Sequence, residues 1–147
     1  MQTIFNTADS AQLISRISSL SEQSKPLWGK MDCFQMMRHC AMSDEMFQRK
    51  KSYKRLFIGR LFGRMALNGI LKNTGSVKKN QPTHPDLKIT GTGNVETEKT
   101  KWIALLNGYA AFPQDDFMHP FFGKMNTDEI GRFVYKHVDH HLKQFGL

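Results

Sequence analysis

The strongest constraint on the fold is the helical pattern of residues 126–146. Asn126 and Glu129 have the spacing of a capping box, with Thr127 as an alternative cap, and Gly146 suits the C′ position. A helix with one apolar face must bury that face against another element of the fold. The apolar residues that recur here every three or four positions are Ile130, Phe133, Val134, Val138 and Leu142.

Further segments also have helical spacing, whereas convincing strand patterns are missing. Asp32 followed by Gln35 gives a second capping-box pattern. The one β-like run, residues 87–90, is short. The additional helical segments cover about residues 8–23, 32–47, 53–72 and 96–112.

These patterns predict an all-α fold, a four-helix bundle formed as a single domain by residues 1–147. The helical segment 53–72 and a long loop at residues 73–94 are then additions between the second and third bundle helices. The loop contains glycines, prolines and many polar residues. A chain of 147 residues buries an adequate core, so we expect it to fold without a disulfide or a metal ion.

The cysteines and the hydropathy pattern predict a cytoplasmic protein. Cys33 and Cys40 would lie roughly 10 Å apart along one helix, too far for a disulfide, so we expect reduced thiols. The first ten residues resemble no signal peptide, and no apolar run is long enough to predict a transmembrane helix.

Positive charge is concentrated in one part of the chain. The net charge is +8, yet residues 49–80 contain ten basic residues and no acidic one, while the rest contains eleven basic and thirteen acidic residues. Tyr53, Phe57 and Phe62 interleave with the basic residues. This composition suits nucleic acid or an anionic membrane surface, although no nucleic-acid motif accompanies it, and a solvated helix face is the simpler interpretation.

Three of the six histidines crowd into one helical turn near the C-terminus. His137 and His141 are four positions apart, so both imidazoles can point to one place, and His140 is an alternative partner for His137. Neutral imidazole nitrogen suits Zn, Ni, Cu and Fe. Two ligands bind weakly, so a metal site requires a third ligand from elsewhere in the chain.

His39 is the candidate for the third ligand. It lies in the middle of a helical segment among apolar residues, where an imidazole without partners is costly. Alternatively, His39 is a hydrogen-bonded core histidine. Three histidines and a water would give the open coordination of catalytic metal sites.

Two stretches of sequence resemble the DinB/YfiT-like superfamily, in particular one uncharacterised bacterial subgroup of it. The first is PLWGKM at residues 26–31 with QMMxH at 35–39, and the second is HPFFGKM at 119–125 with YKHVDHHLKQFG at 135–146. The C-terminal motif is the more specific one. The resemblance implies a four-helix bundle that holds a divalent ion on one histidine of helix 2 and an HxxxH pair of helix 4.

Carried over to this chain, the resemblance implies metal ligands at His39, His137 and His141. His140 then lies outside the ligand set, and Gln144 is placed to orient His141. The ion would be Ni, Zn, Fe or Mn. Some members of the superfamily are metal-dependent thiol transferases or isomerases, so the implied partners are a low-molecular-weight thiol and a small electrophile.

The remaining candidates near this site are weaker. Asp44 could lie at its rim as a base or as a partner of a ligand, and Cys40 is better interpreted as a small buried apolar residue. Trp28 and Tyr135 either line the site or pack in the core.

Three functions are therefore open. The first is a metal-dependent transferase or hydrolase that acts on a small electrophile, although the sequence shows no dedicated general base. The second is a binding module for nucleic acid or anionic surfaces built on residues 49–80. The third is a bundle with a structural metal. Bundles of this type often pair through helix faces, so a homodimer is a further expectation.

Overall fold

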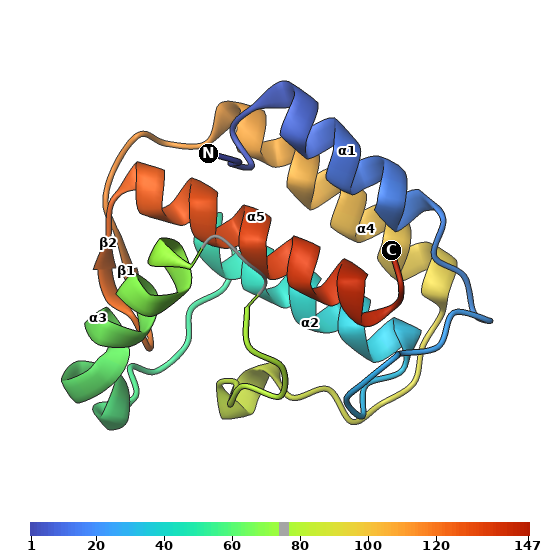
Figure 1. Ribbon diagram of the computed structural model, residues 1–147, viewed down its shortest axis with the longest axis horizontal. Coiled ribbons are helices and arrows are strands. Elements are labelled where there is room, and N and C mark those ends of the chain that lie inside the picture. The colour runs from blue at the N-terminus through green and yellow to red at the C-terminus, as the bar shows by residue number, and fades with distance from the viewer. Residues whose placement is uncertain (74–76) are drawn as a thin grey trace.

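A computed structural model describes residues 1–73 and 77–147 and is mostly helical, as the sequence predicts. Figure 1 shows the arrangement of the helices and a small hairpin. Every helix in these two ranges is too short or too polar to cross a lipid bilayer. The described elements are α1 (Thr7–Ser18), α2 (Cys33–Phe47), α3 (Phe57–Lys72), η1 (Pro85–Leu87), α4 (Val95–Asn107), η2 (Gly108–Ala111), β1 (Phe117–His119), β2 (Gly123–Met125) and α5 (Thr127–Gln144).

Polar caps define where the two helices of greatest interest begin. Both predicted capping boxes are confirmed: Asp32 and Gln35 start α2, and Asn126 and Glu129 start α5, each pair joined by reciprocal side chain to backbone bonds. At the other end of α5, Gly146 has a φ of +81°, the left-handed conformation expected at C′.

Several predicted boundaries are wrong by a few residues. Helix α1 ends at Ser18 rather than near residue 23, since the Ser18 and Ser19 hydroxyls donate to backbone carbonyls of the last turns. Helix α3 begins at Phe57 rather than residue 53, and α4 ends at Asn107 and continues as η2. The β-like run at 87–90 is not a strand, because Leu87 closes η1.

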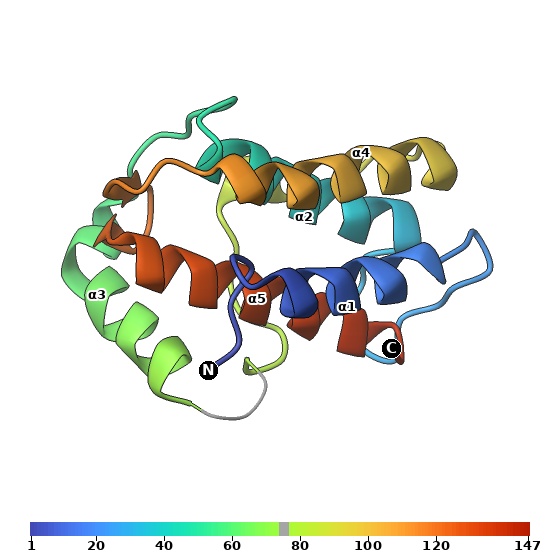
Figure 2. The same cartoon turned by 90° about the horizontal axis from the view of Figure 1, so that it is seen from above.

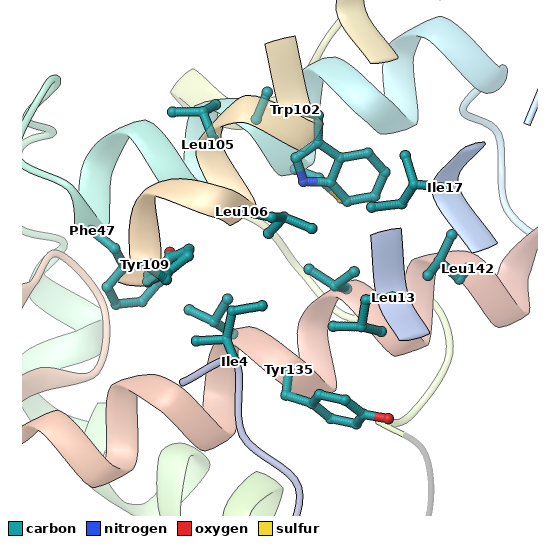
Figure 3. Close-up of a cluster of buried hydrophobic side chains, with 14 of the residues drawn as sticks. Ile4, Leu13, Ile17, Phe47, Trp102, Leu105, Leu106, Tyr109, Tyr135 and Leu142 are labelled. Carbon is teal, nitrogen blue, oxygen red and sulfur yellow. The ribbon is translucent and has the colours of Figure 1, made fainter. Parts of the chain in front are cut away.

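Four helices pack around one core, and α3 lies outside this group. Helix α1 contacts α4 and α5, and α2 contacts the same two helices from the other side (Figures 1 and 2). The core is built from large apolar residues of all four, among them Leu13, Phe47, Trp102 and Leu142 (Figure 3). This burial supplies the main stabilisation of the fold.

The hairpin of β1 and β2 departs from the all-α expectation. The strands are antiparallel, with Phe117 opposite Met125 and His119 opposite Gly123. Gly123 has a φ of +82°, which suits glycine at the start of the returning strand. Packing holds the hairpin in place, because the ring of Phe117 lies 5.2 Å from that of Phe47 on α2. Strands of three residues are too short to give an alternating pattern in the sequence.

Two glycines of α3 allow the tip of this hairpin to lie directly on the helix. A Cβ atom at Gly59 or Gly63 would overlap the carbonyl oxygen of Phe121. The glycines are four residues apart and therefore form a flat strip on one helix face. The two glycines therefore lower the helix propensity of α3, but without side chains they allow a close contact between the helix and the hairpin backbone.

This contact predicts opposite effects of alanine at two glycines of the same helix. Gly63→Ala should lower the free energy of unfolding by about 1–3 kcal/mol, because the methyl group must displace the Phe121 backbone. Gly69→Ala is the matched control: no atom lies within 4 Å of its Cβ position, and we expect a gain of about 0.5–1 kcal/mol. Urea unfolding measures both changes. Equal stability of the two variants would contradict the close contact between α3 and the hairpin.

Candidate functional site

The structure brings His39, His137 and His141 together between α2 and α5. One nitrogen of each histidine lies within 4.8 Å of one nitrogen of each of the others, and this cluster could hold a metal ion. The Nε2 atoms of His39 and His137 are 3.2 Å apart. The three residues predicted as ligands are therefore neighbours in space, although His39 lies almost a hundred positions from the other two.

The position of His39 is fixed by a backbone carbonyl. Its Nδ1 lies 2.9 Å from the carbonyl oxygen of Leu87, the last residue of η1. A carbonyl only accepts, so Nδ1 carries the proton and donates it. The neutral ring then has its lone pair on Nε2, which lies 3.2 Å from Nε2 of His137 and can accept a hydrogen bond from it.

The position of His141 is fixed by a side-chain amide. The Nε2 of Gln144 donates to the carbonyl of Trp28 at 2.8 Å, which turns its Oε1 toward His141. This oxygen lies 2.9 Å from Nδ1 of His141, so Nδ1 of His141 donates as well. Gln144 thus makes the contact with His141 that the sequence predicts, and Nε2 of His141 keeps its lone pair.

His137 is held mainly by aromatic rings. Phe133, one turn earlier on α5, stacks on it with ring centroids 5.7 Å apart and an angle of 10° between the planes. The rings of His39 and His141 approach it edge-on, at 5.3 Å and 4.8 Å. His39 and His141 are buried, and His137 has intermediate exposure.

Burial keeps all three imidazoles neutral. Desolvation lowers the pKa of His39 and lowers that of His137 well below its usual range. Desolvation, with a further contribution from neighbouring His39, lowers the pKa of His141 to about 3. A metal ion binds the neutral imidazole, so these rings are ready for coordination at neutral pH without losing a proton.

The residues present fit a divalent ion with nitrogen ligands. Two imidazole nitrogens bound to one tetrahedral zinc ion at about 2.0–2.1 Å are about 3.3 Å apart, close to the 3.2 Å between His39 and His137. Hydrogen bonds from Nδ1 to a carbonyl or an amide oxygen are the usual support of a metal-bound histidine. His39 and His141 both have this support.

His140 lies beside the cluster and outside it. Its ring is 5.2 Å from that of His141 but packs on Trp28 at 6.0 Å, and it hydrogen-bonds the backbone of Val77. Trp28 therefore contributes to the site indirectly, through the ring of His140 and the amide of Gln144. Tyr135 points away: its hydroxyl bonds Gln2 and Gln12 near α1.

Asp44 does not join the histidines. Its two carboxylate oxygens accept hydrogen bonds from Trp102 Nε1 at 2.9 Å and from the Tyr109 hydroxyl at 2.8 Å. Both donors belong to α4 and η2, which pack on a different face of α2 from α5. Desolvation raises the pKa of the buried Asp44 carboxyl to about 7. The structure thus places Asp44 in the core and not at the rim of the site.

The other histidines and the cysteines have structural surroundings. His119 Nδ1 accepts the backbone N–H groups of Phe121 and Phe122 and shapes the hairpin turn. His84 caps η1 and bonds the Lys54 carbonyl. Cys40 is fully buried beside Met36, and Cys33 is buried as well; both are free thiols.

Sequence reasoning missed two contributors to the site, Phe133 and Leu87. The spacing Phe133, His137, His141 is a regular four-residue repeat, so the stacked ring could have been predicted. The Leu87 carbonyl could not, because it reaches His39 through the folding of the segment between α3 and α4.

Comparison with family models gives one match that covers nearly the whole chain. Residues 3–146 match the family described as "Protein of unknown function (DUF1569)". The chain belongs to this family. Comparisons with curated proteins and with solved structures find no match.

The buried neutral histidines predict that the metal-free protein loses stability in acid. The pKa values of His119 and His141 are lowered to about 3, whereas an unfolded histidine titrates near about 6.5. Between these values the unfolded chain binds more protons, so the stabilisation is complete above about pH 6.5 and falls toward pH 3. We expect a loss of up to about 2 kcal/mol per histidine between pH 7.5 and pH 5, measured by urea unfolding with a chelator.

Asp44 opposes this trend and provides a control. Its folded pKa of about 7 lies above the ordinary value of 3.8, so its contribution to stability grows as the pH falls through that window. Asp44→Asn should therefore make the acid loss steeper. A free energy of unfolding that stays constant from about pH 7.5 to 5 in both proteins would contradict the neutral histidines.

Proposed function

We propose that this protein binds one divalent metal ion through His39, His137 and His141 and uses it to act on a small electrophile. The observation that carries the proposal is the pair of fixed tautomers. Leu87 and Gln144 hold the protons of His39 and His141 on Nδ1, so both Nε2 lone pairs are available to one ion. In a histidine cluster that served only as core packing, these buried Nε2 lone pairs would each need a hydrogen-bond donor.

The resemblance to the DinB/YfiT-like superfamily supports the same proposal. Helices α1, α2, α4 and α5 pack pairwise around one core, and we assign them to the four helices of a DinB-type bundle. His39 then falls on the second bundle helix and the HxxxH pair on the fourth. The DUF1569 family would on this proposal be a branch of that superfamily, with α3 as its addition.

The chain's own groups perform three tasks in the proposed reaction. The three histidines supply neutral ligands, Phe133 shields one face of His137, and Gln144 keeps His141 oriented. A bound divalent ion would supply the chemistry, since it lowers the pKa of a coordinated thiol or water and yields a nucleophile at neutral pH. A transferase would take the nucleophile from a small thiol, a hydrolase from water.

The core argues against a purely structural metal. Trp102, Leu13, Ile17 and Leu142 are essentially without exposed surface, so the helices bury a complete apolar core next to the cluster. Such a core stabilises the bundle by itself. An ion at the cluster would then be available for chemistry and not needed for folding.

Metal content tests the site directly. We expect about one Ni, Zn, Fe or Mn ion per chain in untagged protein, by elemental mass spectrometry, because three imidazoles bind far more tightly than two. His137→Ala should lose the ion, whereas His140→Ala, on the same turn but outside the cluster, should keep it. Gln144→Leu should weaken binding by about tenfold or more. Protein that remains metal-free after incubation with each ion would refute the site.

A requirement for a thiol distinguishes the proposed transferase reaction from the proposed hydrolase reaction. The loaded protein should consume a small electrophile such as 1-chloro-2,4-dinitrobenzene at a rate that rises with thiol concentration, because the ion stabilises the thiolate. A hydrolase would act equally well without thiol. His137→Ala should be about 100-fold slower or worse, with His140→Ala as the control. Absence of both activities, with a large fall in Tm on chelation, would instead indicate a structural metal.

A further inference from the structure

Helix α3 exposes a continuous apolar strip to solvent. Phe57, Leu61 and Met65 are 74%, 65% and 67% exposed, and Ile58 and Phe62 beside them are 57% and 49% exposed. The two sets are each spaced by four residues, so they form adjacent rows on one helix face. Large apolar side chains that are exposed together mark an interaction surface.

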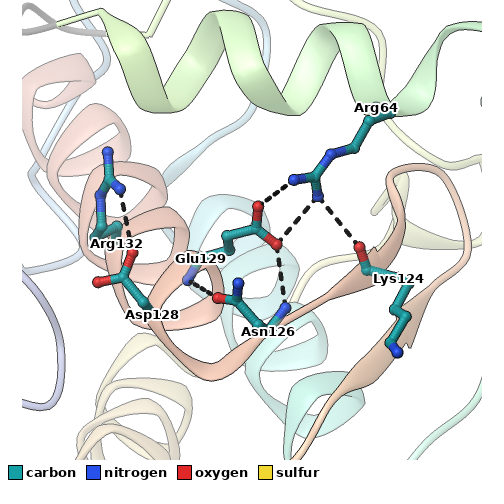
Figure 4. A network of polar contacts seen from close by, with 6 residues as sticks. All are labelled: Arg64, Lys124, Asn126, Asp128, Glu129 and Arg132. Atoms are coloured by element: carbon teal, nitrogen blue, oxygen red, sulfur yellow. Dashed lines mark hydrogen bonds and ion pairs between the residues drawn. The ribbon is translucent and has the colours of Figure 1, made fainter.

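The opposite face of α3 already has its partners. Gly59 and Gly63 lie against Phe121, and Leu67 and Leu71 are buried at the same four-residue spacing. On the flank, Arg64 pairs with Glu129 of α5 (Figure 4). The helix is thus fixed in its rotation, and the apolar strip faces away from the protein.

A basic pocket lies along the flank of this strip. It has a volume of about 570 Å³ and is open between α3 and the hairpin. Four basic side chains and two carboxylates line it, and each carboxylate is paired to one of the basic side chains. The charged lining residues are Arg55, Arg60, Arg64, Lys124, Asp116 and Glu129.

The charge of the surroundings identifies the kind of partner. Residues 49–80 contain no acidic residue, so a second copy docked through the same face would bring two basic rims together. The strip consists of five exposed residues, whereas a stable interface takes about 20–30 residues from each partner. A nucleic acid requires donors at the contact, whereas the centre of this face is apolar.

We propose that α3 binds the surface of an anionic phospholipid membrane. The apolar strip enters the region between headgroups and acyl chains, and the basic pocket beside it takes a headgroup phosphate. Amphipathic helices with bulky apolar residues on one face and Lys or Arg around them bind membranes in this way. The protein would lie on the bilayer surface and not cross it.

Vesicle sedimentation of the full chain, with a chelator present, tests this independently of the metal site. The chain should sediment with vesicles of phosphatidylcholine and phosphatidylserine and not with phosphatidylcholine alone. Phe57→Ser with Leu61→Ser should weaken binding by about tenfold or more, and Arg60→Glu should weaken it as well. The matched controls are Leu27→Ser, 70% exposed, and Lys25→Glu, both in the connection at the opposite end (Figure 1).

Four results would overturn the proposal. The first is an absence of binding to anionic vesicles, and the second is binding that the apolar double variant leaves unchanged. The third is a dimer in analytical ultracentrifugation that the double variant dissociates, which would assign the face to a second copy. The fourth comes from binding of a fluorescent duplex oligonucleotide. Binding that is lost in Arg60→Glu but retained in the double variant would assign the face to nucleic acid.

Discussion

The rotation of α2 is the constraint on which the site depends. The buried Asp44 carboxylate accepts hydrogen bonds from Trp102 and Tyr109, and these bonds fix one face of α2 against α4 and η2. His39 is five residues earlier and therefore about 140° around the helix. Fixing Asp44 thus aims His39 at α5. Rotation of α2 would break these hydrogen bonds and leave a buried carboxyl short of a donor, which is costly. The bonds therefore restrict the rotation of α2 and, with it, the position of His39 in the histidine cluster.

The sequence predicts the elements of this arrangement better than their contacts. Helix α5 was predictable because its caps and its apolar spacing agree, and the same spacing places His137 and His141 on one face. The apolar surroundings of His39 made it the candidate third ligand, and the resemblance to a family gave it the same role. The role of Asp44 was not predictable, because its donors come from a helix some sixty positions later.

The parts that sequence reasoning missed are those in which tertiary contact overrides local preference. The strands of the 117–125 hairpin have three residues each, and their position follows from rings on α2 and from the turn around His119. In the sequence, the glycines of α3 lower its helix propensity. In the structure, Gly59 and Gly63 allow the hairpin backbone to lie directly against α3, and the bulky side chains of α3 lie on the outer face.

The two cysteines have a consequence for any sulfur chemistry at this centre. Both thiols are enclosed; burial raises the pKa of Cys33 to about 11 and raises that of Cys40 well above its usual range. A thiol that stays protonated is a poor nucleophile and a poor ligand. The two cysteine thiols are therefore poor targets for alkylating agents and peroxide in the native protein. For the proposed transferase reaction, the sulfur would therefore have to come from a small thiol in solution.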